Sequence, residues 1–543
     1  MNNAVFSLEV PRNEPLETYA PATPGRAALE AELERQSREQ IEIPLIIGGK
    51  EVRTGKVGKV VMPCEHGHVL ATYHQAGEQE VLQAIDAALR AQRAWERLSW
   101  VERASITLKA AELLSTRYRY RINAATMLGQ GKSAHQAEID SACETIDFLR
   151  FNAHFASRIY SEQPHSSADQ LNRIEFRPLE GFVFALTPFN FTAIASNLNM
   201  SVVLMGNTTV WKPSTTALLS NYHLMNVFQE AGLPDGVINF VPGSGPVVAG
   251  PVLSHPSLAG VHFTGSTATF NGIWRAIAKN LDTLRTYPRL VGETGGKDFV
   301  FVHASADPLE VATGLVRGAF EYQGQKCSAA SRAYLPRSLW PRVRDLMREQ
   351  LASIRMGDVR DFGNFVNAVI DEKSFDSIMG YIERAKAVPG TEIVAGGKGD
   401  KSVGYFIEPT VIQTQDPKSV TMEEEIFGPV LTVYVYPDEQ YAETLEVCDQ
   451  SSPYGLTGAI FARDRYAIVQ ATEALRNAAG NFYINDKPTG AVVGMQPFGG
   501  SRASGTNDKA GGPFNLQRWV SPRTIKETFA PACDYRYPFL AKS

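Results

Sequence analysis

The spacing of hydrophobic positions predicts mainly helices in the N-terminal part of the chain. The first 40 residues form an extended lead with a short charged helix, and residues 43–47 are predicted to be a strand. Apolar residues then recur at intervals typical of helices with one buried face. These predicted helices are residues 26–38, 78–98, 100–118 and 134–160. In the last of them Phe148, Phe151 and Phe155 recur at helical spacing, which indicates a core or subunit-contact stripe.

From residue 181 the pattern changes to short apolar runs that alternate with helices. Such alternation is typical of a parallel sheet with crossover helices. The segments of this first block are residues 181–186, 197–205, 207–211, 217–231, 237–241, 247–253 and 260–263. A second alternating block extends from 299 to about 461, so two α/β domains are predicted. Residues 519–527 mix β-branched and charged residues, and we expect an edge strand that reaches a partner there.

Composition and charge narrow the class of protein. A chain of 543 residues has room for two or three domains, and its 44% hydrophobic and 20% charged residues are ordinary for a globular protein. A net charge of −5 without a long Lys/Arg run argues against a nucleic-acid partner. There is no uninterrupted apolar stretch of about 18 residues, so we expect no membrane span.

Cysteine usage indicates a reducing compartment. The five cysteines are scattered, with no Cys-x-x-Cys pair or Cys/His cluster, so we expect neither disulfides nor a metal site. The start of the chain lacks the apolar core of a signal peptide, and Glu9 and Glu14 fit poorly with an acid-poor transit peptide. A cytoplasmic location is predicted, with the mitochondrial matrix as the alternative.

Three residues in distinctive local contexts can form a covalent aldehyde-oxidising site. Cys327 lies in Gly-Gln-Lys-Cys-Ser, Glu293 in Gly-Glu-Thr-Gly-Gly-Lys, and Asn190 in Thr-Pro-Phe-Asn-Phe. A thiolate attacks a carbonyl carbon. An amide stabilises the resulting oxyanion, and a carboxylate activates the water that hydrolyses the acyl-enzyme.

Two further segments suggest a nucleotide site, although no Gly-x-Gly-x-x-Gly follows a strand. Lys212 ends an apolar run before a proline and can reach a ribose hydroxyl or a phosphate. Gly265 and Ser266 stand between a strand and a predicted helix over 268–280, where backbone N–H groups favour a phosphate. Taken singly, Lys212 is equally consistent with a surface lysine and Ser266 with a simple helix cap.

These segments together resemble the aldehyde dehydrogenase superfamily. The motifs PFNF, WKPS, FTGS, ETGGK, GQKCS, EEIFGPV and PFGGSRASG occur in family order between about residues 45 and 525. The resemblance implies an α/β fold with a variant Rossmann NAD-binding domain, an α/β catalytic domain and a β-ribbon oligomerisation arm. Its implied boundaries are 1–160 with 180–295 for the NAD-binding domain (1–40 as an extension), 296–514 for the catalytic domain, and 161–179 with 515–543 for the arm. A homodimer or higher homo-oligomer follows.

The resemblance also assigns roles by motif position. Cys327 would be the nucleophile, Asn190 part of the oxyanion hole and Glu293 the base for deacylation. The residues on the cofactor side would be Lys212, Gly265, Ser266, Phe189, Glu425 and Phe427. Many NAD-specific members carry an acidic residue where this chain has Thr215, a carboxylate that would grip the ribose diol and repel a 2′-phosphate. Threonine does neither, so NADP is expected to be tolerated. The resemblance implies NAD as the cofactor.

Within the superfamily, FEYQGQKCSAASR, FRPLEGFVFALTPFNFTAIASNLN and PFGGSRASGTNDKAGGP resemble the Δ1-pyrroline-5-carboxylate dehydrogenases. That resemblance implies NAD-dependent oxidation of L-glutamate γ-semialdehyde to L-glutamate, the second step of proline catabolism. Ser328, Gly490 and Ala491 would bind the substrate's α-carboxylate, and Phe191 and Phe498 would flank its aliphatic chain. A carboxylate can accept one hydroxyl and two backbone N–H donors without an arginine.

Alternatives remain at this point. A glycine loop without a ligand also accounts for Gly490, and Phe191 and Phe498 as single residues fit a core. Glu138 and Lys326 are candidates for neutralising the substrate or gating water, and a surface or subunit salt bridge is equally consistent with them. The rival functions are oxidation of another semialdehyde, such as succinate semialdehyde, a CoA-acylating reaction, and a non-enzymatic protein that kept the fold.

Overall fold

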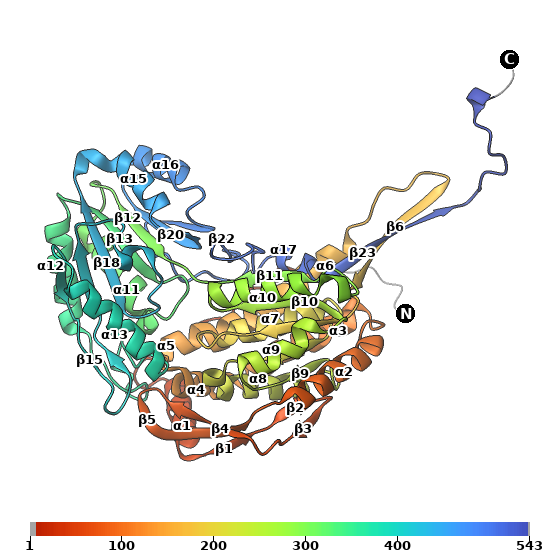
Figure 1. The fold of residues 1–543 in the computed structure, drawn as a ribbon, viewed down its shortest axis with the longest axis horizontal. Coiled ribbons are helices and arrows are strands. Elements are labelled where there is room, and N and C mark those ends of the chain that lie inside the picture. Colours follow the sequence, from red (N-terminus) through yellow and green to blue (C-terminus); the bar gives the residue numbers. More distant parts are fainter. Residues whose placement is uncertain (1–6, 541–543) are drawn as a thin grey trace.

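Two large sheets form the body of the molecule, and the structure, a computed structural model, describes residues 7–540 (Figure 1). In the described part of the chain the first sheet has seven strands. Five neighbouring strands are parallel, and β2 and β3 continue the sheet in antiparallel fashion. In spatial order they are β11 (Arg289–Glu293), β10 (Leu258–Thr264), β7 (Phe182–Leu186), β8 (Thr209–Lys212), β9 (Ile238–Phe240), β2 (Leu45–Ile47) and β3 (Lys50–Val52).

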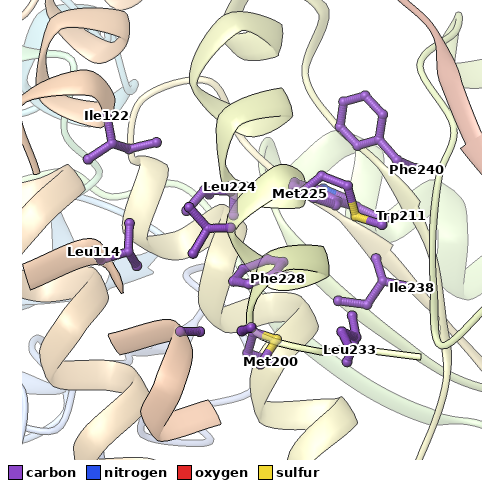
Figure 2. Packing of buried hydrophobic residues seen from close by; sticks show 14 of the residues in the cluster. Leu114, Ile122, Met200, Trp211, Leu224, Met225, Phe228, Leu233, Ile238 and Phe240 are labelled. Carbon is purple, nitrogen blue, oxygen red and sulfur yellow. The ribbon is translucent and has the colours of Figure 1, made fainter. Parts of the chain in front are cut away.

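Helices cover both faces of this sheet, because successive strand residues point to opposite faces. On β7, Phe182 and Phe184 face one cluster and Ala185 faces another. The first face carries α2 (Glu78–Trp95), α9 (Gly245–Ser254) and α10 (Thr267–Lys279). The second face carries α3 (Trp100–Ser115), α4 (Arg119–Gln130), α7 (Thr192–Leu204) and α8 (Leu218–Glu230). Figure 2 shows the packing on this second face, where Met225 and Phe228 of α8 lie beside Trp211, Ile238 and Phe240 of the sheet.

The second sheet has the same layered construction. Within residues 7–540 it also has seven strands, six of them parallel, with β14 antiparallel at one edge. Its order is β14 (Glu392–Ala395), β17 (Thr410–Thr414), β18 (Val430–Tyr436), β13 (Ala330–Pro336), β12 (Asp298–Val302), β20 (Thr457–Phe461) and β21 (Asn481–Ile484). The helices around it are α11 (Pro308–Phe320), α12 (Trp340–Ser353), α13 (Glu372–Lys386), α15 (Tyr441–Gln450) and α16 (Arg465–Ala474).

A two-stranded ribbon projects from the side of the first sheet (Figure 1). It pairs β6 (Gln170–Pro178) with β23 (Val520–Thr528) in antiparallel register, from Val520 opposite Pro178 to Thr528 opposite Gln170. Most of its side chains are exposed or half-buried. The predicted strand near the C-terminus therefore exists and pairs within its own chain. The chain beyond it carries exposed aromatic side chains, including Phe529, Tyr535 and Phe539.

Smaller elements complete the body. The sheet β1 (Ile41–Ile43), β5 (Glu65–His74) and β4 (Val57–Met62) lies beside α1 (Pro24–Arg38), which packs on α4. Other short strands and α-helices are β15 (Gly399–Asp400), β16 (Phe406–Ile407), β19 (Tyr454–Gly455), β22 (Ser501–Arg502), α14 (Val420–Glu423) and α17 (Pro513–Gln517). No helix among the described residues combines the length and the apolar character needed to cross a bilayer.

Two of the predicted elements differ from the structure. The predicted strand 43–47 is split at Pro44, which has no N–H to donate, and its halves join different sheets. The predicted helix over 134–160 is α5 (Ala134–Ala137), a π-helix (Glu138–Glu144) and α6 (Thr145–Ser161). Apolar spacing did not reveal this wider turn, which holds buried charged residues such as Asp140. Phe148, Phe151 and Phe155 are buried in the chain's own core.

Candidate active site

One pocket contains the nucleophile candidate, the base candidate and the substrate-side candidates. Cys327 and Glu293 line it together with Ser328, Gly490 and Ala491. Glu293 is the last residue of β11, at the carboxyl end of the first sheet, and Cys327 precedes β13 of the second sheet. The pocket therefore lies between the two units, at the sheet edge where ligands of α/β proteins usually bind.

The backbone before Cys327 is held in an unusual shape by buried amides. Tyr322 and Gln323 have positive φ values of 52° and 54°, which non-glycine residues adopt at an energetic cost. The Gln323 side chain donates to the carbonyls of Gly131 and Ala368 at 2.9 Å each. Gln325 accepts from the N–H of Ile370 at 2.9 Å. These bonds fix the loop that presents the thiol.

Asn190 lies beside that loop. Its side-chain amide is buried and donates to the carbonyl of Gln325 at 3.1 Å, two residues before Cys327. A primary amide has two N–H groups, so a second one remains to donate to an oxyanion. Asn190 also lies two residues before α7, whose first N–H groups, those of Thr192 and Ala193, donate to Asp140 at 3.0 and 2.8 Å. Asp140 thus caps the helix that follows the amide.

Burial raises the pKa of both reacting groups. Burial raises the pKa of the Cys327 thiol, and the neighbouring Glu293 carboxylate raises it further. Burial also raises the pKa of Glu293 to about 8, against an attraction to Lys509 that lowers it. Both groups therefore become charged only as the pH rises. A base with a pKa near the working pH is suited to removing a proton from water.

Glu293 lies close to a loop that follows β21. A Cβ built on Gly499 would come within 3.1 Å of Glu293 Oε1, so a glycine leaves room for the carboxylate. Lys509 Nζ donates to the carbonyls of Gly480 and Gly499 at 2.8 Å each. The lysine is fixed by these bonds while its charge acts on Glu293.

The predicted substrate-binding residues line the same pocket. Ser328 Oγ is 2.8 Å from Thr489 Oγ1, and both residues are buried. Gly490 has φ +99°, a conformation that favours glycine and that lets a backbone N–H turn inward. Phe191 and Phe498 also line the pocket. The structure thus brings all five substrate-side candidates (Ser328, Gly490, Ala491, Phe191 and Phe498) to the walls around Cys327.

The cofactor candidates lie at the carboxyl ends of strands of the first sheet. Lys212 ends β8, and burial lowers its pKa to about 8. The Thr215 hydroxyl bonds to Tyr73, and as a threonine it offers no carboxylate to a ribose. Ser266 caps α10 by accepting from Thr269 N–H at 3.3 Å. The N–H of Gly265 donates to the carbonyl of Glu293 at 3.2 Å, so this turn touches the base candidate.

The second group of cofactor candidates comes from the other sheet. Glu425 accepts from the N–H of Gly296 at 2.8 Å, and burial raises its pKa to about 7. Phe427 has φ 58° and meets Phe189 edge to face, with ring centroids 5.8 Å apart. The segment from Glu425 to Phe427 therefore joins the loop after β7, which carries Asn190. Hydroxyl, lysine and carboxylate groups suited to a dinucleotide thus come from both of the units that carry the large sheets.

Some residues near the pocket were missed by sequence reasoning. Lys132 is buried, pairs with Asp140 at 2.7 Å, and lies 3.9 Å from the ring centre of Phe191. Lys509 was quoted within a motif but given no role. The ionisable residues of the pocket lining itself that were also missed are His135, Glu144, Arg317, Glu321, Lys487 and Asp508. These residues share no spacing in the chain, so only the fold brings them together.

Glu138 and Lys326 occupy different environments. Glu138 is buried away from the pocket lining and binds Arg119 and the Tyr19 hydroxyl, an ion pair internal to the chain. Lys326 lines the pocket and lies 3.4 Å from Glu321. Burial lowers the pKa of Lys326 to about 8.

Comparison with known protein families identifies the family of this chain. The model of the aldehyde dehydrogenase family matches residues 51–525. The chain belongs to the aldehyde dehydrogenase family. This confirms the resemblance and the fold class that the sequence predicted. The division into domains and the roles of individual residues stay predictions.

Relatives within the aldehyde dehydrogenase family are similar over nearly the whole chain. A mitochondrial delta-1-pyrroline-5-carboxylate dehydrogenase of Dictyostelium discoideum is 52% identical over 537 residues, 98% of this chain and 96% of that protein. The mitochondrial human protein of the same name is 50% identical over 98% of this chain and 95% of its own length. The crystal structure of a Delta-pyrroline-5-carboxylate dehydrogenase from Mycobacterium tuberculosis, bound with NAD, is 50% identical, covers both chains fully and has a TM-score of 0.96.

Proposed function

We propose that this chain oxidises L-glutamate γ-semialdehyde, formed from Δ1-pyrroline-5-carboxylate, to L-glutamate with NAD, the second step of proline catabolism. One observation carries the proposal: a single pocket has Cys327 and Glu293 beside Ser328, Gly490 and Ala491. A reactive thiol and a carboxylate-binding wall then face one substrate. The names of the relatives at 50–52% identity support the same substrate.

The proposed reaction uses the chain's residues in sequence. The Cys327 thiolate adds to the aldehyde carbon and forms a thiohemiacetal, whose oxyanion accepts from the Asn190 amide and from the N–H of Cys327. A bound NAD would supply the acceptor for the hydride that leaves this adduct, and loss of the hydride converts the adduct into the thioester. Glu293 takes a proton from water, which attacks the thioester and releases glutamate and the free thiol. A base in this position disfavours the CoA-acylating alternative, since water would consume the thioester.

The proposed cofactor site uses residues from both units. Lys212 would bind the adenosine ribose, Gly265 and Ser266 the pyrophosphate, and Glu425 with Phe427 and Phe189 the nicotinamide side. The hydrogen-bonding groups at these positions fit a dinucleotide. The NAD in the Mycobacterium tuberculosis crystal structure supports this assignment.

Substrate choice follows from the distance between thiol and anchor. The carboxylate anchor fixes how far the aldehyde carbon reaches, so chain length decides which aldehyde meets the thiol. The deciding experiment is steady-state kinetics with Δ1-pyrroline-5-carboxylate, succinate semialdehyde and propanal. We expect the highest kcat/KM for Δ1-pyrroline-5-carboxylate. A higher kcat/KM for succinate semialdehyde would reject glutamate semialdehyde as the preferred substrate. Absence of NADH formation with every aldehyde would reject the proposed dehydrogenase activity.

Replacement of Ser328 by alanine tests the anchor. The lost hydroxyl donates to a charged carboxylate, a bond strong enough that we expect KM for glutamate semialdehyde to rise about 10-fold or more. KM for propanal, which has no carboxylate, should change little. Steady-state kinetics on both aldehydes measures this, with Ser338→Ala at an exposed position as the control. Equal changes for the two aldehydes would remove Ser328 from the anchor.

Replacement of Thr215 by glutamate tests the choice of cofactor. A carboxylate at this position would repel the 2′-phosphate of NADP and bind the ribose diol of NAD. We expect kcat/KM with NADP to fall at least about 10-fold while the value with NAD is kept. Thr215→Gln, which has nearly the same shape without the charge, is the matched control. A similar fall with both cofactors would show a packing defect instead.

Assembly and location complete the proposal. We propose the domain boundaries 1–160 with 180–295, 296–514, and 161–179 with 515–543, because the two sheets and the ribbon fall within them. The projecting ribbon and the exposed aromatic residues beyond it support a homodimer or higher homo-oligomer. The scattered cysteines favour the cytoplasm, and the mitochondrial names of several relatives favour the matrix as the alternative.

A further inference from the structure

An N-terminal segment contacts the loop that carries the substrate side of the pocket. Residues 7–19 lie along α6 and the π-helix of the same chain. Near its start, the carbonyl of Leu8 is 2.8 Å from His154 Nδ1 on α6. Near its end, the Tyr19 hydroxyl donates to Glu138 at 2.6 Å. Between these points the segment passes the loop that carries the proposed carboxylate anchor.

Asn13 joins that loop to α6. Its side-chain nitrogen donates to Asp147 Oδ2 at 2.7 Å and to the backbone carbonyl of Val493 at 2.9 Å. An amide nitrogen has two N–H groups, and here each has its own acceptor. The side chain therefore bridges a helix and a loop that are more than 340 residues apart in the chain.

The residue after Asn13 fixes this bridge in place. The N–H of Glu14 donates to Asp147 Oδ1 at 2.7 Å, so Asp147 holds two successive residues of the segment. The Glu14 carboxylate has an exposed fraction of only 9% and pairs with Arg119 and Arg150 at 2.6 Å each. Charged pairs with this little exposure are screened weakly by solvent. Asn13 is thus held on one side before it reaches the loop.

The loop that accepts the bond contains the proposed anchor. Val493 is three residues after Gly490, and its side chain is buried and lines the pocket. Its carbonyl direction is coupled to the neighbouring peptide planes because each residue has only two soft backbone angles. The next residue, Gly494, has φ +80° and lies so close to Phe151 of α6 that a Cβ would clash at 2.2 Å. The loop is therefore set against α6 at two successive residues.

We propose that Asn13 is a positioning residue for the carboxylate of the substrate. By holding the Val493 carbonyl, it keeps the loop of Gly490 and Ala491 in the position from which their N–H groups would bind the carboxylate. The proposal rests on the proposed function, because it needs a substrate with a carboxylate at that end. It gives the N-terminal segment a role in substrate selection although none of residues 7–19 lines that pocket.

The expected change in kinetics is confined to the substrate that carries a carboxylate. Loosening the loop weakens hydrogen bonds to the carboxylate and leaves Cys327, Glu293 and the cofactor side unchanged. KM for glutamate semialdehyde should rise, whereas kcat, KM for propanal and KM for NAD should stay within about 2-fold. A purely structural role would change stability without this selectivity.

Asn13→Ala and Asn13→Asp test the proposal in the full-length enzyme. Asn13→Ala removes both donors, and we expect KM for glutamate semialdehyde to rise about 5- to 10-fold. Asn13→Asp keeps the shape, loses the donors and places a carboxylate against Asp147, so its effect should be larger. Arg12→Ala, at the exposed neighbouring residue, is the control and should leave all KM values unchanged. Inhibition by L-glutamate provides a second measurement, and its inhibition constant should rise in parallel.

The outcomes separate the two proposals. Equal changes of KM for glutamate semialdehyde and propanal in Asn13→Ala, or a fall in Tm with unchanged KM values, would overturn the role of Asn13. Failure of the proposed function appears in the unmodified enzyme, as absence of turnover with Δ1-pyrroline-5-carboxylate. The role of Asn13 is tested only by comparing variant with unmodified enzyme, so the two failures are distinguishable.

Discussion

Replacement of Cys327 by alanine is expected to lower the rate of aldehyde oxidation by at least about four orders of magnitude, the scale seen when a nucleophile is removed. Without the thiol no thiohemiacetal forms. Loss of hydride from the free aldehyde would then leave an acylium-like carbon of high energy. The Asn190 amide and the Glu293 carboxylate then have no adduct on which to act. The assay is NADH absorbance with Δ1-pyrroline-5-carboxylate at saturating NAD.

The Cys327→Ala protein should still fold and bind NAD, because the residues proposed to hold the cofactor are untouched. NAD binding by calorimetry and Tm by thermal unfolding check this. Cys533→Ala removes an exposed thiol in the C-terminal segment and serves as the matched control, with full activity expected. Turnover of Cys327→Ala within about 100-fold of the unmodified enzyme would reject the nucleophile assignment.

The sequence predicted the fold class well because its two sheets follow periodicity rules. Each buried parallel strand of the first sheet, such as β7 or β10, appears in the sequence as a short apolar run between helical segments. The π-helix at Glu138–Glu144 was not predictable in this way. Its buried Asp140 accepts from residues far along the chain, the N–H groups of Thr192 and Ala193, and apolar periodicity contains no sign of such partners.

Some residues of the site could be predicted from the sequence, and others could not. Cys327, Glu293 and Asn190 stand in motifs whose chemistry is recognisable from residue type and order. Lys509, which acts on Glu293, lies more than 200 residues from it in the chain. Its effect depends on a lysine held by backbone carbonyls near a buried carboxylate, a condition that only tertiary contacts create.

Replacement of Glu293 by glutamine should stop the reaction after the thioester forms. Glutamine keeps the shape of the side chain and cannot take a proton from water, so we expect hydrolysis to slow by about 10²- to 10⁴-fold. Intact mass spectrometry after addition of NAD and aldehyde should show a covalent adduct on Cys327. Glu439→Gln, at an exposed acid, is the control and should show no adduct at steady state. Absence of the adduct in Glu293→Gln would reject the role of Glu293 as the base.

The pH dependence gives the same assignment a second test. Because burial raises the pKa of Glu293 to about 8, the fraction of carboxylate rises as pH passes through 8, and hydrolysis of a preformed acyl-enzyme should accelerate over that range. In the acyl-enzyme the thiol is blocked, so its own titration does not contribute.

The stability of the fold should fall as pH rises, whereas the rate of hydrolysis should increase. A carboxyl whose pKa rises from 4.5 to about 8 on folding stabilises the fold below pH 4.5, and this contribution is lost as pH rises through 8. Glutamine does not titrate, so the Tm of Glu293→Gln should increase relative to the unmodified enzyme between pH 5 and pH 9 (about the interval of those two pKa values). We expect Glu293→Gln to show slow hydrolysis that does not depend on pH, together with this gain in Tm at high pH. Both results together would mean that the buried Glu293 carboxylate lowers stability and also acts as the base. A relative loss of Tm at high pH would show that the carboxylate is favourably placed, and the raised pKa would then not explain the pH profile.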